Sequence, residues 1–281
     1  MKLLVCLKQI PDPRLVEFNV QKKELECSAW RLNPLDGVAL EEALRLKDNP
    51  DVSVTVITVG PDRAGRILRQ GLTSGADNAI RVWEPFLERT DAYVTAQVLA
   101  AAGSQLNADL ILCGARSADG GGGCVGAYLA EELGIPYITR AVALTSRDGA
   151  VTAHSREESG WREELHAMLP AVVGVDTGLN EPRYVPLLSR AYKQGMNKPI
   201  EIWDVEKLGV KQDQLGCLVL AVEVMQPRPR TKVGTKVSGL SMAQKLKLMR
   251  GQAGGRQREV LTGAPSEVAP RILARLEEWL A

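Results

Sequence analysis

Strand-like and helix-like segments alternate through the first 115 residues of the chain, and this alternation restricts the fold more than any other feature. The strand-like segments are short, apolar and rich in β-branched residues, and the segments between them carry apolar residues at helical spacing. Strands separated by helices of this length pair in parallel through right-handed crossovers. The sequence therefore predicts an α/β fold with a doubly wound, mostly parallel sheet. We expect its strands at 2–8, 52–59, 78–83 and 110–113, and its helices at 37–47, 62–72, 91–106 and 125–133.

The pattern changes after Pro136. Three segments are typical of antiparallel strands, and Arg147-Asp-Gly149 favours a three-residue hairpin turn between the first two. We expect an antiparallel hairpin insertion, followed by a further central strand and then by irregular chain. The expected antiparallel strands are 140–146, 150–157 and 163–169, the central strand is 170–176, and the irregular segment is 177–200.

The composition shifts again near Met225. Residues 226–258 contain nine Lys or Arg and no Asp or Glu, and residues 265–280 carry apolar side chains at helical spacing. Such a segment has little to bury by itself. We therefore expect a nucleotide-binding α/β domain over residues 1–225 and a C-terminal arm over 226–281 that packs on a partner. The alternative is a disordered basic tail.

A run of four glycines, Gly120 to Gly123, lies between the predicted strand at 110–113 and the predicted helix at 125–133. Without Cβ atoms, such a loop lets a ligand approach the backbone closely, and the N–H groups and dipole of the following helix favour an anion. This arrangement favours a phosphate site. The alternative is a loop without a ligand.

Composition limits the function further. The chain has 281 residues, 45% of them apolar, and a net charge of +1, which argues against a dedicated nucleic-acid binder. Its five cysteines form no C-x-x-C pair, and with two histidines they give no metal site of recognisable spacing. The apolar N-terminal stretch is too short for a signal peptide, and no stretch approaches a membrane span. We expect a cytoplasmic protein with reduced thiols and no direct insertion into a membrane.

Sequence motifs for common catalytic sites are missing. Gly121-Gly-Gly123-Cys-Val-Gly126 matches the dinucleotide pattern G-x-G-x-x-G, but it follows the fourth strand and begins well after it, so we reject a nicotinamide site. There is no Walker loop, no G-x-S-x-G elbow and no H-E-x-x-H. The sequence thus favours a nucleotide holder without its own nucleophile or base, in which a cofactor carries the chemistry.

Four blocks in order make the chain resemble the β subunit of electron transfer flavoprotein over nearly its whole length to about residue 225. The most specific is the Leu-Asn-Glu-Pro-Arg-Tyr sequence that ends the fourth block. The blocks are Val5-Cys-Leu-Lys-Gln-Ile-Pro-Asp12, residues 33–47 beginning Asn33-Pro-Leu-Asp36, Gly114-Ala-Arg-Ser-Ala-Asp-Gly120, and residues 170–184.

The resemblance implies a Rossmann-like sheet related to adenine-nucleotide hydrolase folds. It also implies a heterodimer with an α subunit, which carries the redox FAD and on which the arm would pack. The β subunit of ordinary members holds a structural AMP, and that of electron-bifurcating members holds a second FAD that accepts electrons from NADH. Such a heterodimer shuttles electrons between acyl-CoA or other dehydrogenases and a quinone reductase or ferredoxin.

The resemblance further implies which residues bind the nucleotide. Cys6 would face the adenine, Val59 would end a strand beside it, and the segment from Arg116 would wrap the phosphates. The full set is Cys6, Asn33, Pro34, Leu35, Asp36, Val59, Arg116, Ser117, Ala118, Asp119, Gly120, Gly121, Gly122, Gly123, Cys124, Val125, Gly126 and Ala127.

The chain departs from the family pattern within the glycine run. The family usually has polar side chains where Gly121, Gly122 and Cys124 stand, so the phosphates would depend on backbone N–H groups and on Arg116. Val125-Gly126 and Gly134-Ile-Pro136 are more similar to the bifurcating branch, which favours FAD over AMP. A site that has lost its nucleotide is the remaining alternative.

A docking loop is the second implied feature. In the family, a leucine just beyond the Asn-Glu-Pro-Arg-Tyr sequence inserts into partner dehydrogenases. Leu187 falls at that position, and Leu188 could act in the same way. The alternative is that both pack against the core. Two other functions are a nucleotide-sensing module like the universal stress proteins, which lacks this block, and nucleic-acid binding by the arm, which has few aromatic residues for stacking.

Overall fold

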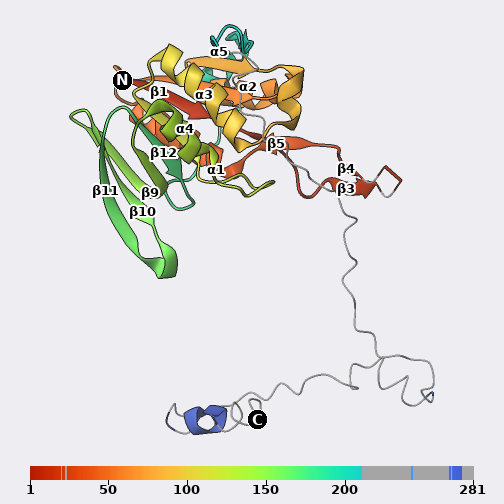
Figure 1. Cartoon of the computed structure of the whole chain (residues 1–281), viewed down its shortest axis with the longest axis vertical. Coiled ribbons are helices and arrows are strands. Elements are labelled where there is room, and N and C mark those ends of the chain that lie inside the picture. Colours follow the sequence, from red (N-terminus) through yellow and green to blue (C-terminus); the bar gives the residue numbers. More distant parts are fainter. Residues whose placement is uncertain (20, 23, 211–241, 243–265, 267, 274–281) are drawn as a thin grey trace. The chain divides into compact units, whose positions relative to one another are not determined.

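The structure is a computed structural model that describes residues 1–210 except 20 and 23, together with residues 242, 266 and 268–273 (Figure 1). Its centre is a nine-stranded sheet in the order β11-β10-β9-β12-β8-β1-β6-β7-β13. All neighbours from β9 to β13 in this order pair in parallel, and β10 pairs antiparallel with β9 and β11. The predicted α/β, mostly parallel, Rossmann-like fold is therefore confirmed. In sheet order the strands are Arg162–Met168, Ala150–Arg156, Tyr137–Arg147, Ala171–Val175, Leu110–Gly114, Lys2–Cys6, Ser53–Val59, Asn78–Val82 and Glu201–Trp203.

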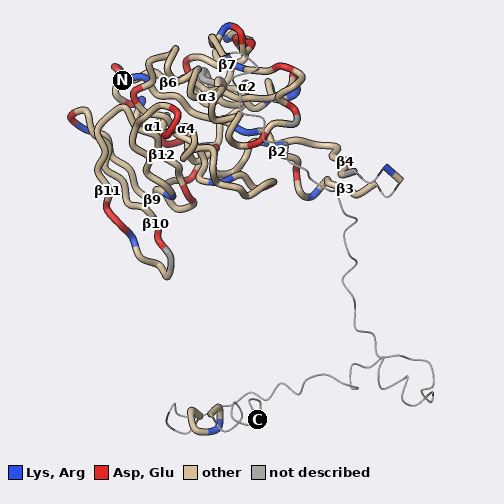
Figure 2. The backbone as a smooth tube through the Cα atoms, viewed as in Figure 1, with Lys and Arg blue, Asp and Glu red and all other residues tan. Residues whose placement is uncertain are grey.

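Helices cover both faces of the parallel part of the sheet (Figure 1). α1 (Pro34–Leu46) and α2 (Gly65–Ser74) share one core cluster with residues of β1, β6 and β12. α3 (Ala92–Leu106) and α4 (Val125–Leu133) share a second cluster with the opposite face of the same strands. Buried strands without charges make both clusters possible, since β6, β8 and β12 contain no charged residue (Figure 2).

The antiparallel extension confirms the expected insertion but corrects its turn. β9 and β10 are joined by two residues, Asp148 and Gly149, both with positive φ (51° and 75°). A two-residue loop with positive φ at both positions matches the right-handed twist of the strands, and Asp-Gly is a favoured sequence for it. The predicted three-residue turn is therefore wrong. The outer strand β11 begins Arg162-Glu-Glu164 and is largely exposed.

Several short elements lie outside the predicted set. α5 (Arg190–Asn197) forms within the segment expected to be irregular, because the Ser189 hydroxyl accepts a hydrogen bond from Tyr192 N–H (3.1 Å) and caps the helix. β13 adds an edge strand after it. Two small antiparallel ribbons project between β1 and α1: β2 (Gln9–Pro11) with β5 (Trp30–Leu32), and β3 (Val16–Asn19) with β4 (Glu24–Cys27).

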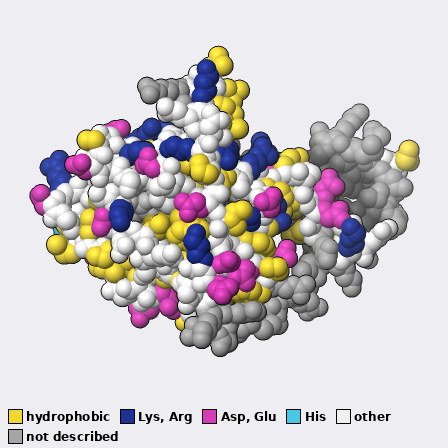
Figure 3. Space-filling view, turned by 90° about the horizontal axis from the view of Figure 1, so that it is seen from above, with side chains coloured by type: hydrophobic (Ala, Val, Ile, Leu, Met, Phe, Trp, Pro, Cys, Tyr) yellow, Lys and Arg dark blue, Asp and Glu magenta, His cyan; other side chains and the backbone are white. Residues whose placement is uncertain are grey.

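The backbone divides into two units, Met1–Gln226 and Pro227–Ala281. In the second unit residues 266 and 268–273 are helical, within the helix predicted at 265–280. The basic stretch and most of the predicted arm lie outside the described residues, so its packing on a partner stays a prediction. In the described residues no helix has the length and apolarity to cross a membrane. On the face in Figure 3, acidic, basic and hydrophobic side chains of the described residues are interspersed.

Candidate nucleotide-binding site

A cavity of about 520 Å³ opens at the carboxyl ends of β1, β6 and β8. The chain runs from β1 to β6 and β7 on one side and then returns to place β8 on the other side of β1. Open α/β sheets bind ligands at such a switch point, outside the carboxyl ends of the strands. Its volume is within the range of small-molecule sites, about 300–1,000 Å³. The position therefore makes the cavity the candidate functional site.

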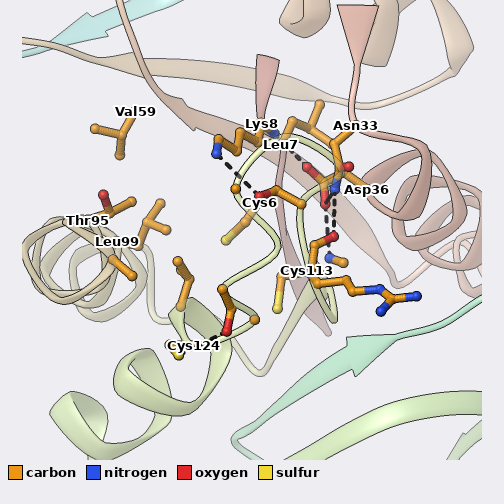
Figure 4. A pocket seen from close by; sticks show the side chains of 18 of the residues that line it. Cys6, Leu7, Lys8, Asn33, Asp36, Val59, Thr95, Leu99, Cys113 and Cys124 are labelled. Atoms are coloured by element: carbon orange, nitrogen blue, oxygen red, sulfur yellow. Dashed lines mark hydrogen bonds between the residues drawn. The ribbon is translucent and has the colours of Figure 1, made fainter. Parts of the chain in front are cut away.

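One side of the cavity is largely apolar. Cys6 of β1 and Cys113 of β8 lie side by side on neighbouring strands, and Leu99 of α3 lies across the cavity from them (Figure 4). Burial raises the pKa of the Cys113 thiol to about 12 and that of Cys6 well above its usual value, so both stay uncharged at neutral pH. The two cysteines form a wall with Ile57 and Val59 of β6. This wall faces Leu99, and the space between them suits a flat, uncharged ring.

The opposite side is the glycine loop. Gly121 and Gly123 have positive φ (67° and 64°), and a Cβ on Gly123 would lie 3.1 Å from the Ala115 carbonyl oxygen. A side chain at either position would therefore be strained, as the glycine run suggested. The Gly121 N–H donates to the Ser117 carbonyl (3.0 Å), which closes the loop on itself.

The loop leads directly into the N-terminus of α4, whose N-cap residue, Cys124, makes no side-chain hydrogen bond to the helix. The N-terminus of α3, on the same cavity, is capped by Asp91, which accepts from Val94 N–H (3.0 Å). The first N–H groups of a helix have no acceptors within it. Of these two helix ends, α4 is therefore the one that offers its N–H groups to an anion.

Asp36 holds the base of this loop. Its buried carboxylate accepts from Lys8 N–H (2.6 Å), Gly114 N–H (3.1 Å) and the Asn33 side-chain amide (2.9 Å) (Figure 4). A Cβ on Gly114 would collide with Asp36 and Leu35, so only glycine fits there. Burial outweighs these hydrogen bonds and raises the pKa of Asp36 to about 7. One carboxyl group thus joins the ends of β1 and β8 to the start of α1.

The Asn33 side chain also makes hydrogen bonds to the loop. Its amide nitrogen donates to the Arg116 carbonyl (3.1 Å) as well as to Asp36, and its amide oxygen accepts from Ala118 N–H (3.1 Å). The resemblance included this residue in the set that would bind the nucleotide. The structure gives it partners of its own within the loop, and so it shapes the site.

Eleven of the eighteen residues named from the sequence line the cavity. They are Cys6, Asn33, Asp36, Val59, Arg116, Ser117, Gly120, Gly122, Gly123, Cys124 and Val125. The others support these or lie near them. Pro34 is the first residue of α1, and Leu35 packs near Gly114. Ala118 and Gly121 donate backbone hydrogen bonds, and Asp119 pairs with Lys8. On α4, Gly126 packs against Tyr137 and Ala127 is exposed.

Lys8 is a cation that the sequence analysis did not name. Its ammonium group pairs with Asp119 (2.8 Å) and contacts the Ser117 hydroxyl (3.4 Å). Burial opposes the ionised form of Asp119, but the hydrogen bonds from Lys8, Ser117 and Gly120 together lower its pKa. Lys8 follows directly after the first parallel strand, and this position in the sequence could have indicated that it lies at the site. The cavity lining also includes Leu7, Ile57, Thr58, Glu88, Thr90, Asp91, Ala92, Thr95, Leu99, Cys113, Gly114 and Ala115.

Tyr137 fixes the other end of the glycine segment. A Cβ on Gly126 of α4 would lie 2.8 Å from the Tyr137 ring, and one on Gly174 of β12 would lie 2.5 Å from its hydroxyl. The ring therefore occupies a slot between these two glycines. Gly126 sets how closely α4 approaches the sheet.

The second candidate region follows β12. Leu187 and Leu188 are 64% and 84% exposed, and Tyr184 is also exposed, so these side chains do not pack against the core. At the base of the loop Arg183 forms a paired hydrogen bond with Glu41 of α1 (2.7 and 3.0 Å). Among the described residues no group of three or more His, Cys, Asp or Glu side chains is placed to hold a metal ion.

Comparison with known proteins decides the family. Residues 25–208 match the family model described as "Electron transfer flavoprotein domain". The chain belongs to the electron transfer flavoprotein β-subunit family.

Three relatives show the extent of this similarity. The "Caffeyl-CoA reductase-Etf complex subunit CarD" of Acetobacterium woodii is 34% identical over 77% of this chain and 83% of its own length. The "Electron transfer flavoprotein subunit beta" of Methylophilus methylotrophus is 32% identical over 77% and 84%. That of Mycobacterium leprae is 30% identical over 84% and 92%. The electron transfer flavoprotein resemblance drawn from the sequence motifs is confirmed.

Proposed function

We propose that this β subunit forms a heterodimer with an electron transfer flavoprotein α subunit and holds an adenine nucleotide in the cavity at the β1–β8 switch point. The heterodimer would carry electrons between dehydrogenases and a quinone reductase, ferredoxin or another acceptor. The observation that carries the proposal is the uncapped N-terminus of α4, which opens on this cavity behind a loop with two positive-φ glycines.

Each part of the site has a role in this proposal. The adenine ring would lie between the uncharged thiols of Cys6 and Cys113 and the side chain of Leu99. The glycine loop would approach the phosphates through its N–H groups. Arg116 and Lys8 would supply positive charge at the phosphate end. Lys8 can do so only by sharing or leaving its ion pair with Asp119.

Two nucleotides fit this chemistry, FAD and AMP. We favour FAD, because Val125-Gly126 and Gly134-Ile-Pro136 are more similar to the bifurcating branch. A relative named as part of a reductase–Etf complex supports the same choice. A bound FAD supplies a ring that accepts and releases electrons, and the chain's own residues would bind and orient it. With AMP, the nucleotide would be structural and the redox FAD would lie on the α subunit alone.

The exposed loop after β12 would dock partner proteins. Leu187 and Leu188 present apolar surface on a segment stiffened by Pro182 and Pro186. Acyl-CoA dehydrogenases or other flavin-containing dehydrogenases are the proposed partners. A few large anchors at the centre of a small interface suit a transient electron-transfer encounter.

The test is to purify the full chain with its α subunit, denature the complex and count the nucleotides released. Two FAD per heterodimer support the bifurcating proposal, and one FAD with one AMP supports the alternative. If nothing beyond one FAD is released, the cavity holds no nucleotide and the proposal is wrong. Arg116→Ala should lower the released amount, and its deficit relative to wild type should shrink at high salt, because salt screens the attraction that Arg116 supplies.

A further inference from the structure

The loop after β12 exposes large apolar side chains at its tip but has buried polar anchors at its base. Tyr184, Leu187 and Leu188 are exposed, whereas the residues just before them reach back to helix α1. Water favours collapse of such a tip onto the nearest apolar surface. Whether the tip stays available to a partner therefore depends on what fixes the base.

Glu41 makes the strongest of these anchors. Its carboxylate is only 7% exposed and accepts three hydrogen bonds from Arg183: from Nε (2.7 Å), from Nη2 (3.0 Å) and from the backbone N–H (3.1 Å). The bond to the backbone fixes the path of the chain as well as the side chain. A paired guanidinium–carboxylate contact is both strong and specific in direction.

Glu42, the next residue of α1, makes a weaker anchor. It accepts one hydrogen bond from the Asn180 amide (2.9 Å), which also donates to the Val38 carbonyl (3.1 Å). Burial raises the pKa of Glu42, and the Asn180 bond only partly offsets this. For Glu41 burial also acts to raise the pKa, but the hydrogen bonds and charge of Arg183 outweigh it and lower the pKa overall. Glu41 is therefore ionised at neutral pH.

We propose that Glu41 is a positioning residue for partner docking, which holds the loop at residues 180–188 in the conformation that presents Leu187. Glu42 assists it to a lesser degree. The inference rests on the proposed function of the loop, and adds that helix α1 sets the position of its base. A loop held in its docking conformation does not lose conformational freedom on binding, so it docks more tightly.

The test uses the full chain in complex with its α subunit and compares Glu41→Gln with wild type. Glutamine keeps one acceptor oxygen but presents an amide NH₂ to the guanidinium donors, so the paired contact is lost. Hydrogen exchange of the Arg183 backbone amide, the loop amide that donates to Glu41, should rise about tenfold or more. With an acyl-CoA dehydrogenase as electron donor, KM for the donor should rise to a similar extent, while kcat and nucleotide content stay unchanged.

Two further variants keep the test decisive. Arg183→Lys breaks the same paired contact by changing Arg183, the half-exposed partner. It should reproduce the effect even if Glu41→Gln folds poorly. Arg45→Ala removes the other cation near Glu41 (3.4 Å) without touching the loop and should leave both readouts at wild-type values.

The outcomes separate this inference from the proposed function. If Leu187→Ala raises KM but Glu41→Gln and Arg183→Lys change neither KM nor loop exchange, the positioning role is overturned and docking stands. A rise in loop exchange with unchanged KM likewise overturns it, because a freed loop would then dock as well as a held one. If Leu187→Ala also leaves KM unchanged, the docking function is wrong and the inference is overturned with it.

Discussion

Two loops follow neighbouring parallel strands, β8 and β12, and both are fastened to α1 by buried carboxylates, yet they present opposite surfaces. The loop after β8 is held by Asp36 in the first turn of α1 and ends in a run of glycines. The loop after β12 is held by Glu41 and Glu42 farther along the helix and carries large exposed apolar side chains. The first presents backbone and the second presents side chains.

The difference teaches how one helix can serve two kinds of recognition. A phosphate requires N–H groups and close approach, so side chains at the tip are a hindrance. A protein partner requires apolar area, so side chains at the tip supply the affinity. In both loops the polar residues lie at the base and make defined hydrogen bonds to α1, while the tips differ according to the ligand that we propose.

The largest expected effect comes from removing the anchor of the first loop. Asp36→Ala would leave the buried N–H groups of Lys8 and Gly114 and the Asn33 amide without this acceptor. We expect the free energy of unfolding to fall by about 3 kcal/mol or more, as measured by urea denaturation of the heterodimer. Glu42→Ala in the second anchor removes a single acceptor and should cost about 1 kcal/mol. Equal losses would mean that the two anchors do not differ as proposed.

Asp36 should also give the first anchor a distinctive pH dependence. Its folded pKa of about 7 lies above the ordinary value of 3.8, so the folded protein holds a proton that the unfolded chain releases. Its contribution to stability is complete below about pH 4 and is lost as pH rises through about 7.

The free energy of unfolding of wild type, relative to that of Asp36→Asn, should therefore fall as pH rises. Denaturation series from about pH 4 to about pH 8 measure this. Asp119→Asn is the control. Because the pKa of Asp119 is lowered, its contribution is present above the unfolded value and is lost as pH falls. A pH-independent difference for Asp36→Asn would contradict the proposed burial effect.

At the tip of the second loop, Leu187→Ala should weaken docking without changing flavin content. Truncating an interface anchor typically costs about 2 kcal/mol, which is roughly a thirtyfold rise in KM for the dehydrogenase. Leu25→Ala is a matched control, because Leu25 is 66% exposed against 64% for Leu187 but lies on the β3–β4 ribbon. The same rise in both variants would show a general effect of lost apolar surface.

The smallest effect is expected at the glycine tip of the first loop. Gly123→Ala imposes a positive φ on a residue with a Cβ, at a cost of about 1–2 kcal/mol, and adds the contact with the Ala115 carbonyl. Gly121→Ala has the strain but open space, and Gly122→Ala meets no atom within 4 Å. Nucleotide released per heterodimer should therefore decrease in the order Gly122, Gly121, Gly123. If all three variants retain the wild-type amount, the loop does not approach a phosphate closely.

Much of this molecule could be predicted from local sequence. The apolar strands at residues 52–59 and 110–113 and the helix at 125–133 lie where their periodicity placed them, because burial of a continuous face depends on pattern alone. The glycine run indicated a backbone-lined loop, because residues without a Cβ leave the backbone accessible. α5 was missed because its cap, Ser189, and its contact with α2 give little signal in a segment interrupted by prolines.

The sequence by itself determined the parallel architecture, the glycine loop and, through its motifs, the family. Only the tertiary structure decided that Asp36 and Asn33 serve the loop as anchors, that Lys8 reaches Asp119, and that Glu41 holds Arg183 across 142 positions of sequence. Periodicity and motifs depend only on residues that are close to one another along the chain. Hydrogen bonds between distant segments depend on strand order and crossover, which bring the ends of β1, β8 and β12 together beside α1.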